Sequence, residues 1–194
     1  LSKNSQQLPR LNLKTIEEAN FNQIENIRQI IFHDHSHQFA ILNLEEKLGN
    51  YGLSWRSNHT QPIIEHSSTQ KLLWIGIDQQ LAAICQQTGR LNLKMNLTSN
   101  IISLLLYQET THQEATYQET TYQEITAVLT EDRLLIFNPN GSMRYSQGLP
   151  DMPEEMSIVG NNLLIEFLEE NSLIVNPQTG KVETEENQQI LMNS

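Results

Sequence analysis

Three histidines stand at alternate positions in the segment HDHSH, residues 33–37. Side chains of a β-strand repeat every two residues, so in an extended segment His33, His35 and His37 would point to one face. Imidazole nitrogens are common ligands of zinc and copper, and Asp34 could orient a ring or supply an oxygen ligand. A solvated hairpin loop is the alternative interpretation of the segment. The spacing makes His33, His35 and His37 the candidate metal ligands of this chain.

Acidic residues recur in short polar turns that lie between apolar runs. If these turns belong to repeated units and lie at one end of the fold, their carboxylates could form an acidic rim for a cation or a basic partner. Asp also favours turns because it accepts backbone hydrogen bonds, which explains the pattern without a ligand. The candidate partner-binding residues are Asp34, Asp78, Asp132 and Glu170.

No segment has the spacing of a familiar catalytic or cofactor motif. The chain lacks the phosphate-binding pattern G-x-x-x-x-G-K-[ST], the dinucleotide pattern G-x-G-x-x-G and the hydrolase pattern G-x-S-x-G. Carboxylate pairs such as Glu154–Glu155 are neighbours in sequence and are more typical of a solvated surface than of an acid–base pair. We therefore predict no catalytic residues and no cofactor.

Charge and hydropathy limit the classes of partner. Lys and Arg number 12 against 23 Asp and Glu, and the net charge of −11 disfavours binding to nucleic acid or to anionic lipid. No apolar run is long enough to span a membrane, so we predict no membrane insertion within this chain. A cytoplasmic location is expected, with the reservation that the chain begins at Leu rather than Met and could lack an upstream signal or anchor.

The segments that would position these residues repeat along the chain. Asn-Pro pairs begin at Asn138 and Asn176, which are 38 residues apart, and alignment of Thr-Gly pairs places Cys85 opposite Asn176. The spacing of 53 from Cys85 to Asn138 breaks the period, but three surplus copies of a pentapeptide in residues 107–126 account for 15 of these residues. Asn43 precedes Cys85 by 42 residues. Four units of nearly 40 residues are typical of a β-propeller.

Each unit contains short apolar runs separated by polar turns, which predicts four antiparallel strands per unit. In the first unit the runs at residues 29–32 and 39–47 are expected to form a hairpin around the turn HDHSHQ. The all-β fold is therefore about four propeller-like blades, either a closed four-bladed ring or, as we favour, a fragment of a larger propeller. A short helix within residues 11–31 is an alternative at the N-terminal end, but RLNLK occurs at both 10–14 and 90–94 and predicts the outer strand of an earlier unit there. The units are approximately 22–57, 62–97, 100–149 with the insertion at 107–126, and 155–186, in a single domain 1–194.

Two segments resemble known propeller repeats. LLWIGIDQQLAAICQQTGRL, residues 72–91, resembles the repeat of bacterial two-component-regulator propellers, in which a Leu-Trp-Ile-Gly phrase, an Asp turn and a Thr-Gly phrase recur. NPQTGK, residues 176–181, is similar to a strand-ending phrase of pyrroloquinoline-quinone-type propellers. The resemblance covers roughly residues 25–186, although only one unit carries the full phrase. It implies a sensing or scaffold role and transfers no site residue.

These observations predict a non-catalytic binding or scaffold module that serves protein–protein interaction or ligand sensing, with an unidentified protein partner or small ligand. The alternatives are a propeller hydrolase or lyase with a metal in its channel, and an inactive fragment of a sensor input domain. The pentapeptide run, YQETTHQEATYQETTYQEIT, is interpreted as a tolerated insertion that extends a hairpin as two polar arms or forms a loop. Deletion of residues 107–121 is expected to leave the fold intact.

Overall fold

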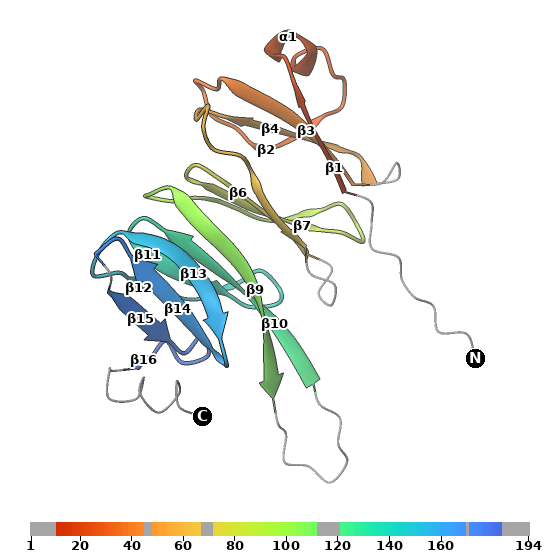
Figure 1. Cartoon of the computed structure of the whole chain (residues 1–194). Helices are drawn as coiled ribbons and strands as arrows, with labels where there is room; N and C mark the ends of the chain where they lie inside the picture. The colour runs from red at the N-terminus through yellow and green to blue at the C-terminus, as the bar shows by residue number, and fades with distance from the viewer. Residues whose placement is uncertain (1–10, 45–47, 67–71, 112–120, 170, 184–194) are drawn as a thin grey trace, which may run out of the picture. The chain divides into compact units, whose positions relative to one another are not determined.

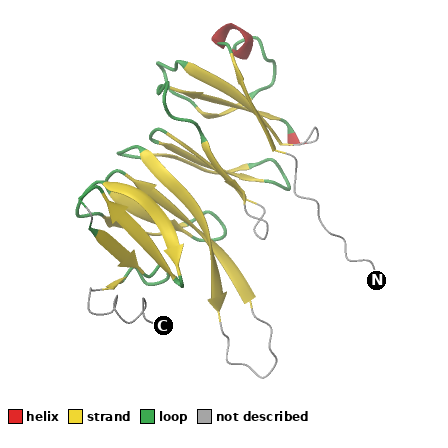
Figure 2. Cartoon of the chain, viewed as in Figure 1, coloured by secondary structure: helices red, strands yellow, loops and turns green. Residues whose placement is uncertain are grey.

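The computed structural model describes residues 11–44, 48–66, 72–111, 121–169 and 171–183 (Figure 1). Strands dominate these ranges, and α1 (Glu18–Phe21) is a short helix (Figure 2). The chain divides into two compact units, Leu1–Thr98 and Ser99–Ser194, which are described separately below.

Unit 1 holds two four-stranded sheets. In spatial order, sheet 1 consists of β1 (Leu11–Ile16), β3 (Gln38–Leu44), β4 (Asn50–Trp55) and β2 (Arg28–Ile31). Sheet 2 consists of β5 (Ile63–His66), β6 (Leu72–Ile77), β7 (Gln80–Cys85) and β8 (Leu91–Asn96).

Unit 2 holds two further four-stranded sheets. Sheet 3 consists of β9 (Ile101–Thr111), β10 (Thr121–Thr130), β11 (Arg133–Phe137) and β12 (Met143–Gly148). Sheet 4 consists of β13 (Pro153–Val159), β14 (Asn162–Phe167), β15 (Ser172–Val175) and β16 (Val182–Glu183).

Sheets 2, 3 and 4 are meanders in which consecutive strands pair antiparallel. This is the arrangement of a propeller blade, and the prediction of an all-β, propeller-like fold with four four-stranded sheets is confirmed. That the sheets make a single domain with the predicted unit boundaries stays a prediction.

The repeat alignment has a structural counterpart in the turn that joins the third and fourth strands of these meanders. In each turn the backbone N–H of a glycine donates to the carbonyl of the residue that ends the third strand or directly follows it. The pairs are Gly89 to Cys85 at 2.8 Å, Gly141 to Asn138 at 2.9 Å, and Gly180 to Asn176 at 2.8 Å. The sequence alignment of Cys85, Asn138 and Asn176 therefore matches equivalent positions in three sheets.

Sheet 1 departs from the predicted connectivity. The expected hairpin between residues 29–32 and 39–47 is wrong, because β2 pairs with β4 in parallel and β3 pairs with β1 and β4. The HDHSH segment therefore joins two strands that are not neighbours in the sheet. The single parallel pair also distinguishes sheet 1 from the three meanders.

The strand order of sheet 1 partly explains why RLNLK occurs at both 10–14 and 90–94. Strand β1 does not belong to an earlier unit, as the sequence suggested, but forms an edge of sheet 1, just as β8 forms an edge of sheet 2. Its register places Leu13 opposite Leu42, and Leu13 packs against the unit 1 core. Of the helix that was the alternative within residues 11–31, the structure contains only the four residues of α1.

Each unit has its own apolar core. The unit 1 core lies between sheets 1 and 2 and includes Leu42, Leu53, Trp55, Ile75 and Ile84. The unit 2 core lies between sheets 3 and 4 and includes Tyr107, Ile125, Ile136, Ile165 and Val175. The central strands are apolar at successive positions and buried on both faces: all six residues of β6 and four of the five residues of β11 are buried. Within these strands, alternate residues such as Leu73 and Ile75, or Leu134 and Ile136, belong to the core of their unit.

Candidate functional site

The histidine segment is a turn rather than a strand. Strand β2 ends at Ile31 and β3 begins at Gln38, so the segment is not the extended strand that would place His33, His35 and His37 on one face. The His33 and His35 ring centroids lie 6.4 Å apart, and the backbone N–H of His35 donates to His33 Nδ1 at 3.1 Å. Because Nδ1 accepts this bond, a neutral His33 ring carries its proton on Nε2 and offers no free ligand nitrogen.

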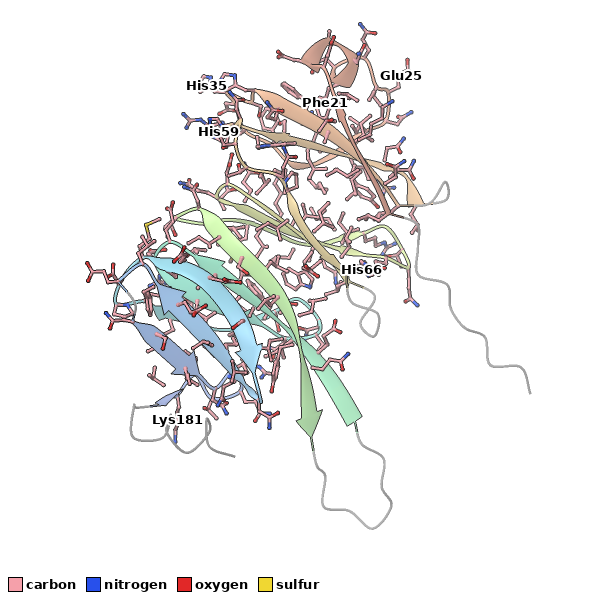
Figure 3. All side chains as sticks on the ribbon, in the orientation of Figure 1. Phe21, Glu25, His35, His59, His66 and Lys181 are labelled. Carbon is pink, nitrogen blue, oxygen red and sulfur yellow. The ribbon has the colours of Figure 1, made fainter. Side chains whose placement is uncertain are left out.

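A second loop lies beside this turn. Gln38 Nε2 donates to Asn58 Oδ1 at 3.0 Å, which brings the loop of His59 next to the turn of His35 (Figure 3). In the described parts of the chain, no three His, Cys, Asp or Glu side chains form a group that could hold a metal ion. Metal binding by His33, His35 and His37 stays a prediction, and binding through His33 requires that its hydrogen bond be broken.

The turn acid of sheet 2 binds the preceding connection within unit 1. Asp78 Oδ2 accepts hydrogen bonds from the backbone N–H groups of Arg56 and Ser57 at 3.0 and 3.4 Å. Its Oδ1 accepts from Thr60 Oγ1 at 3.1 Å. Asp78 thus fixes the segment between β4 and β5 to the β6–β7 turn.

Sheet 3 uses its turn acids in a similar way within unit 2. Asp132 Oδ1 accepts from Ser99 Oγ, and from Thr130 Oγ1 at 3.0 Å. Glu131 accepts from the backbone N–H and the side-chain Nδ2 of Asn100 at 3.2 and 2.8 Å. The hydrogen bond from Ser99 holds the pKa of the Asp132 carboxyl below its ordinary value, because it stabilises the ionised form.

The two other predicted rim residues have different surroundings. Asp34 is exposed in the turn before β3, and Glu170 lies outside the described residues. Partner binding by Asp34, Asp78, Asp132 and Glu170 stays a prediction. At Asp78 and Asp132 the structure shows carboxylate oxygens that already accept hydrogen bonds from their own unit.

The feature that the sequence interpretation undervalued is the β9–β10 hairpin. Strand β10 pairs with β9 from Thr121 to Thr130, but with β11 only from Thr126 to Leu129. Residues 107–111 and 121–125 therefore form a two-stranded extension of sheet 3, called the ribbon below (Figure 1). This confirms the interpretation of the pentapeptide run as two paired arms for these residues, while residues 112–120 lie outside the described ones.

The ribbon is anchored at its base in the unit 2 core. Tyr107 is only 4% exposed, and its hydroxyl donates to the carbonyl of Asn161 at 3.0 Å. Tyr107 pairs with Ile125, which is fully buried. The sequence held a signal for this arrangement, because YQEIT is the one pentapeptide with an Ile at its fourth position and that Ile is residue 125.

In the backbone register of the described ribbon, no Glu lies opposite another Glu. Gln108 lies opposite Glu124 and Glu109 lies opposite Gln123. Antiparallel pairing of any two copies of the phrase Gln-Glu produces this match, because the order reverses across the pair. Elsewhere in unit 2 two like-charged residues do lie opposite each other, Glu155 and Glu166, so the fold does not require Gln to pair with Glu. The Gln–Glu pairing in the ribbon is therefore a consequence of the repeated phrase itself.

No helix in the described residues is both long and apolar enough to cross a membrane.

Comparisons with known proteins locate the chain only at the level of the fold. No family model matches the sequence, and no curated protein matches it. Among solved structures, BBS1N in complex with ARL6DN is similar at 8% identity over 76% of this chain and 48% of that chain, with a TM-score of 0.46. Sqt1 of Saccharomyces cerevisiae is similar at 11% identity over 77% of this chain and 56% of its own, with a TM-score of 0.33.

BamB of Moraxella catarrhalis is similar at 10% identity over 90% of this chain and 67% of its own, with a TM-score of 0.26. The chain thus spans about half the length of BBS1N and of Sqt1. Because all three TM-scores are low, the propeller-like assignment rests on the four sheets of the chain itself.

Proposed function

We propose that this chain is a non-catalytic protein-interaction module in which the ribbon binds an extended segment of a protein partner by strand addition. The observation that carries the proposal is the incomplete pairing of β10. Among the described residues, Thr121, Tyr122 and Gln123 pair with β9 on one side and lie beyond the pairing of β10 with β11, which begins at Thr126. The N–H and C=O groups along such an edge form a template for an added strand.

The composition of the ribbon supports a polar and positively charged partner segment. Every copy of the pentapeptide carries one Glu, and the chain as a whole has a net charge of −11. A Lys- or Arg-rich segment is therefore attracted electrostatically, while main-chain hydrogen bonds supply most of the contact. The polar sequence also protects the edge from the nonspecific association that an apolar edge strand would promote.

The resemblance of residues 72–91 to the repeats of two-component-regulator propellers supports the same class of function, since it implies a sensing or scaffold role. Within that class, the ribbon gives the partner a specific point of attachment. Sheets 3 and 4 then serve as the rigid support that fixes the base of the ribbon through Tyr107 and Ile125.

The test is a deletion of residues 110–119, which shortens the ribbon and retains the pairs of Tyr107 with Ile125 and of Glu109 with Gln123. The probe is a fluorescent synthetic peptide of alternating Lys and Val, and binding is measured by anisotropy at several salt concentrations. We expect the full chain to bind the peptide and the deletion variant to bind it at least about tenfold more weakly, which is a change of roughly 1.4 kcal/mol.

The deletion removes Glu114 and Glu119, so a control must remove two charges elsewhere in unit 2. The double variant Glu154→Gln, Glu155→Gln provides this control, because both residues are exposed on β13. Equal loss of binding in the control and in the deletion would show that general electrostatic attraction, and not strand addition at the ribbon, binds the peptide.

A further inference from the structure

The face of sheet 1 that points away from the unit 1 core is covered by the segment that includes α1. Along β3, Ala40, Leu42 and Leu44 belong to the core, so the alternate residues Phe39 and Ile41 lie on the opposite face. Phe21, the last residue of α1, is only 3% exposed, and its ring centroid lies 5.3 Å from that of Phe39. Figure 3 shows Phe21 between the helix and the sheet.

Gly52 of β4 makes room for this contact. A Cβ atom at Gly52 would lie 2.8 Å from Phe21 Cζ, closer than such atoms approach, and 3.0 Å from Ile27 Cδ1, a tight contact, so both side chains would have to shift. Gly52 pairs with Ile41, so it lies on the same face as Ile41 and Phe39. Phe21 and Ile27 therefore rest directly on the backbone of the sheet, at a position where any other residue would hold them off.

The helix itself contributes little to the stability of this cover. Helix α1 has four residues, and its N-cap residue Glu17 makes no side-chain capping hydrogen bond. A single helical turn is unstable in water because nucleation fixes several dihedral angles for few hydrogen bonds. The segment is therefore held on the sheet by the packing of Phe21 and Ile27.

The outer surface of the segment is polar. Phe21 is its one buried residue, and most of the others are exposed polar residues: Glu17, Glu18, Asn20, Asn22, Gln23, Glu25 and Asn26. A β-sheet with two apolar faces normally packs against another layer on each face.

We propose that residues 17–27 are an end cap that closes this face of sheet 1 and prevents two copies of the chain from stacking sheet 1 on sheet 1. The occupant excluded by the end cap is a second copy because its own face has the same apolar residues, Phe39 and Ile41. The proposal goes beyond the binding function proposed above, and it involves no residue of the ribbon.

Two substitutions in the full chain test the end cap from opposite sides. Phe21→Asp removes the ring that holds the cap, and Gly52→Ala adds one methyl group beneath it. Phe32→Asp is the matched control, because Phe32 is already 46% exposed and the same charge is introduced there. Sedimentation velocity over a range of protein concentrations measures self-association, and hydrogen exchange of residues 17–27 measures release of the cap.

We expect Phe21→Asp and Gly52→Ala to exchange faster in residues 17–27 and to self-associate with a dissociation constant at least about tenfold lower than that of the parent chain. Phe32→Asp should sediment like the parent chain. Faster exchange without greater self-association overturns the proposal. Loss of the unit 1 fold in both variants also overturns it, because the segment would then be an integral part of sheet 1 and not a cover.

Discussion

The contact between Tyr51 and Gly89 offers a quantitative test of how the two sheets of unit 1 are joined. Tyr51 Oη donates to the carbonyl of Gly89 at 2.7 Å, and Arg28 Nη1 donates to the same carbonyl at 2.9 Å. Both donors come from sheet 1, whereas Gly89 lies in the β7–β8 turn of sheet 2. Gly89 has a φ of +64°, and a Cβ atom there would lie 2.6 Å from Tyr51 Oη and 2.8 Å from the carbonyl oxygen of Leu48.

We therefore predict that Gly89→Ala destabilises unit 1 by about 2–5 kcal/mol. The left-handed backbone costs a non-glycine residue about 1–2 kcal/mol. The added methyl group displaces the Tyr51 hydroxyl and, because it also meets the carbonyl oxygen of Leu48, shifts the Gly89 turn. These movements cost the hydrogen bonds from Tyr51 and from Arg28 to the Gly89 carbonyl, at about 0.5–1.5 kcal/mol each. The second contribution is specific to this position because it depends on the crowding around the added methyl group.

Gly49→Ala is the matched control within the same unit. Gly49 also has a positive φ, +97°, but nothing lies within 4 Å of the position where a Cβ atom would be added. It should cost only the backbone term of about 1–2 kcal/mol. Urea denaturation followed by tryptophan fluorescence suits both variants, because the only tryptophans of the chain, Trp55 and Trp74, are buried in unit 1.

The expected result is that the midpoint of the Gly89→Ala transition falls clearly below that of Gly49→Ala, at an unchanged slope. Equal destabilisation of the two variants, within about 0.5 kcal/mol as is usual for independent sites, would refute the reasoning. It would mean that Tyr51 moves aside without loss and that the inter-sheet hydrogen bonds do not contribute to stability.

Three further predictions follow from the described contacts. The pKa of the Asp132 carboxyl is lowered in the folded state, so its contribution to stability is present above the ordinary pKa of 3.8 and is lost as the pH falls through the lower pKa of the folded state. The variant Asp132→Asn should therefore be less stable than the parent chain at neutral pH. Thermal melts followed by circular dichroism should show that this difference in stability shrinks in acid. Ser54 Oγ is buried without a hydrogen-bond partner among the described residues, so Ser54→Ala should be neutral or stabilising by up to about 1 kcal/mol in urea titrations, and a loss of more than that would contradict the assignment. Deletion of residues 107–121 removes Tyr107 but places Tyr122 directly after Leu106, so a tyrosine still stands at this position of the chain. We therefore expect unit 2 to stay folded in this variant and in the variant that lacks residues 110–119, and loss of the cooperative thermal transition of either variant would contradict the expectation.

The sequence alone determined the features of this protein that depend on local chemistry. Short apolar runs between polar turns determined the strands, and the recurring turn phrases determined the period, because a turn of given hydrogen bonding requires the same few residue types wherever it occurs. The glycine turns at Cys85, Asn138 and Asn176 are local structures, and removal of the surplus pentapeptides was enough to align them. The fold class was accessible for this reason.

Sheet order and the roles of individual side chains were decided by the tertiary structure. The parallel pairing of β2 with β4 brings together residues distant in sequence, and no local preference distinguishes it from the hairpin that was expected. That choice turned the histidine segment into a connection between strands that are not neighbours, and it left a sheet face for Phe21 to cover. Likewise, Asp78 and Asp132 were visible in the sequence as turn acids, but only their partners at the start of the neighbouring connection show what their carboxylates do.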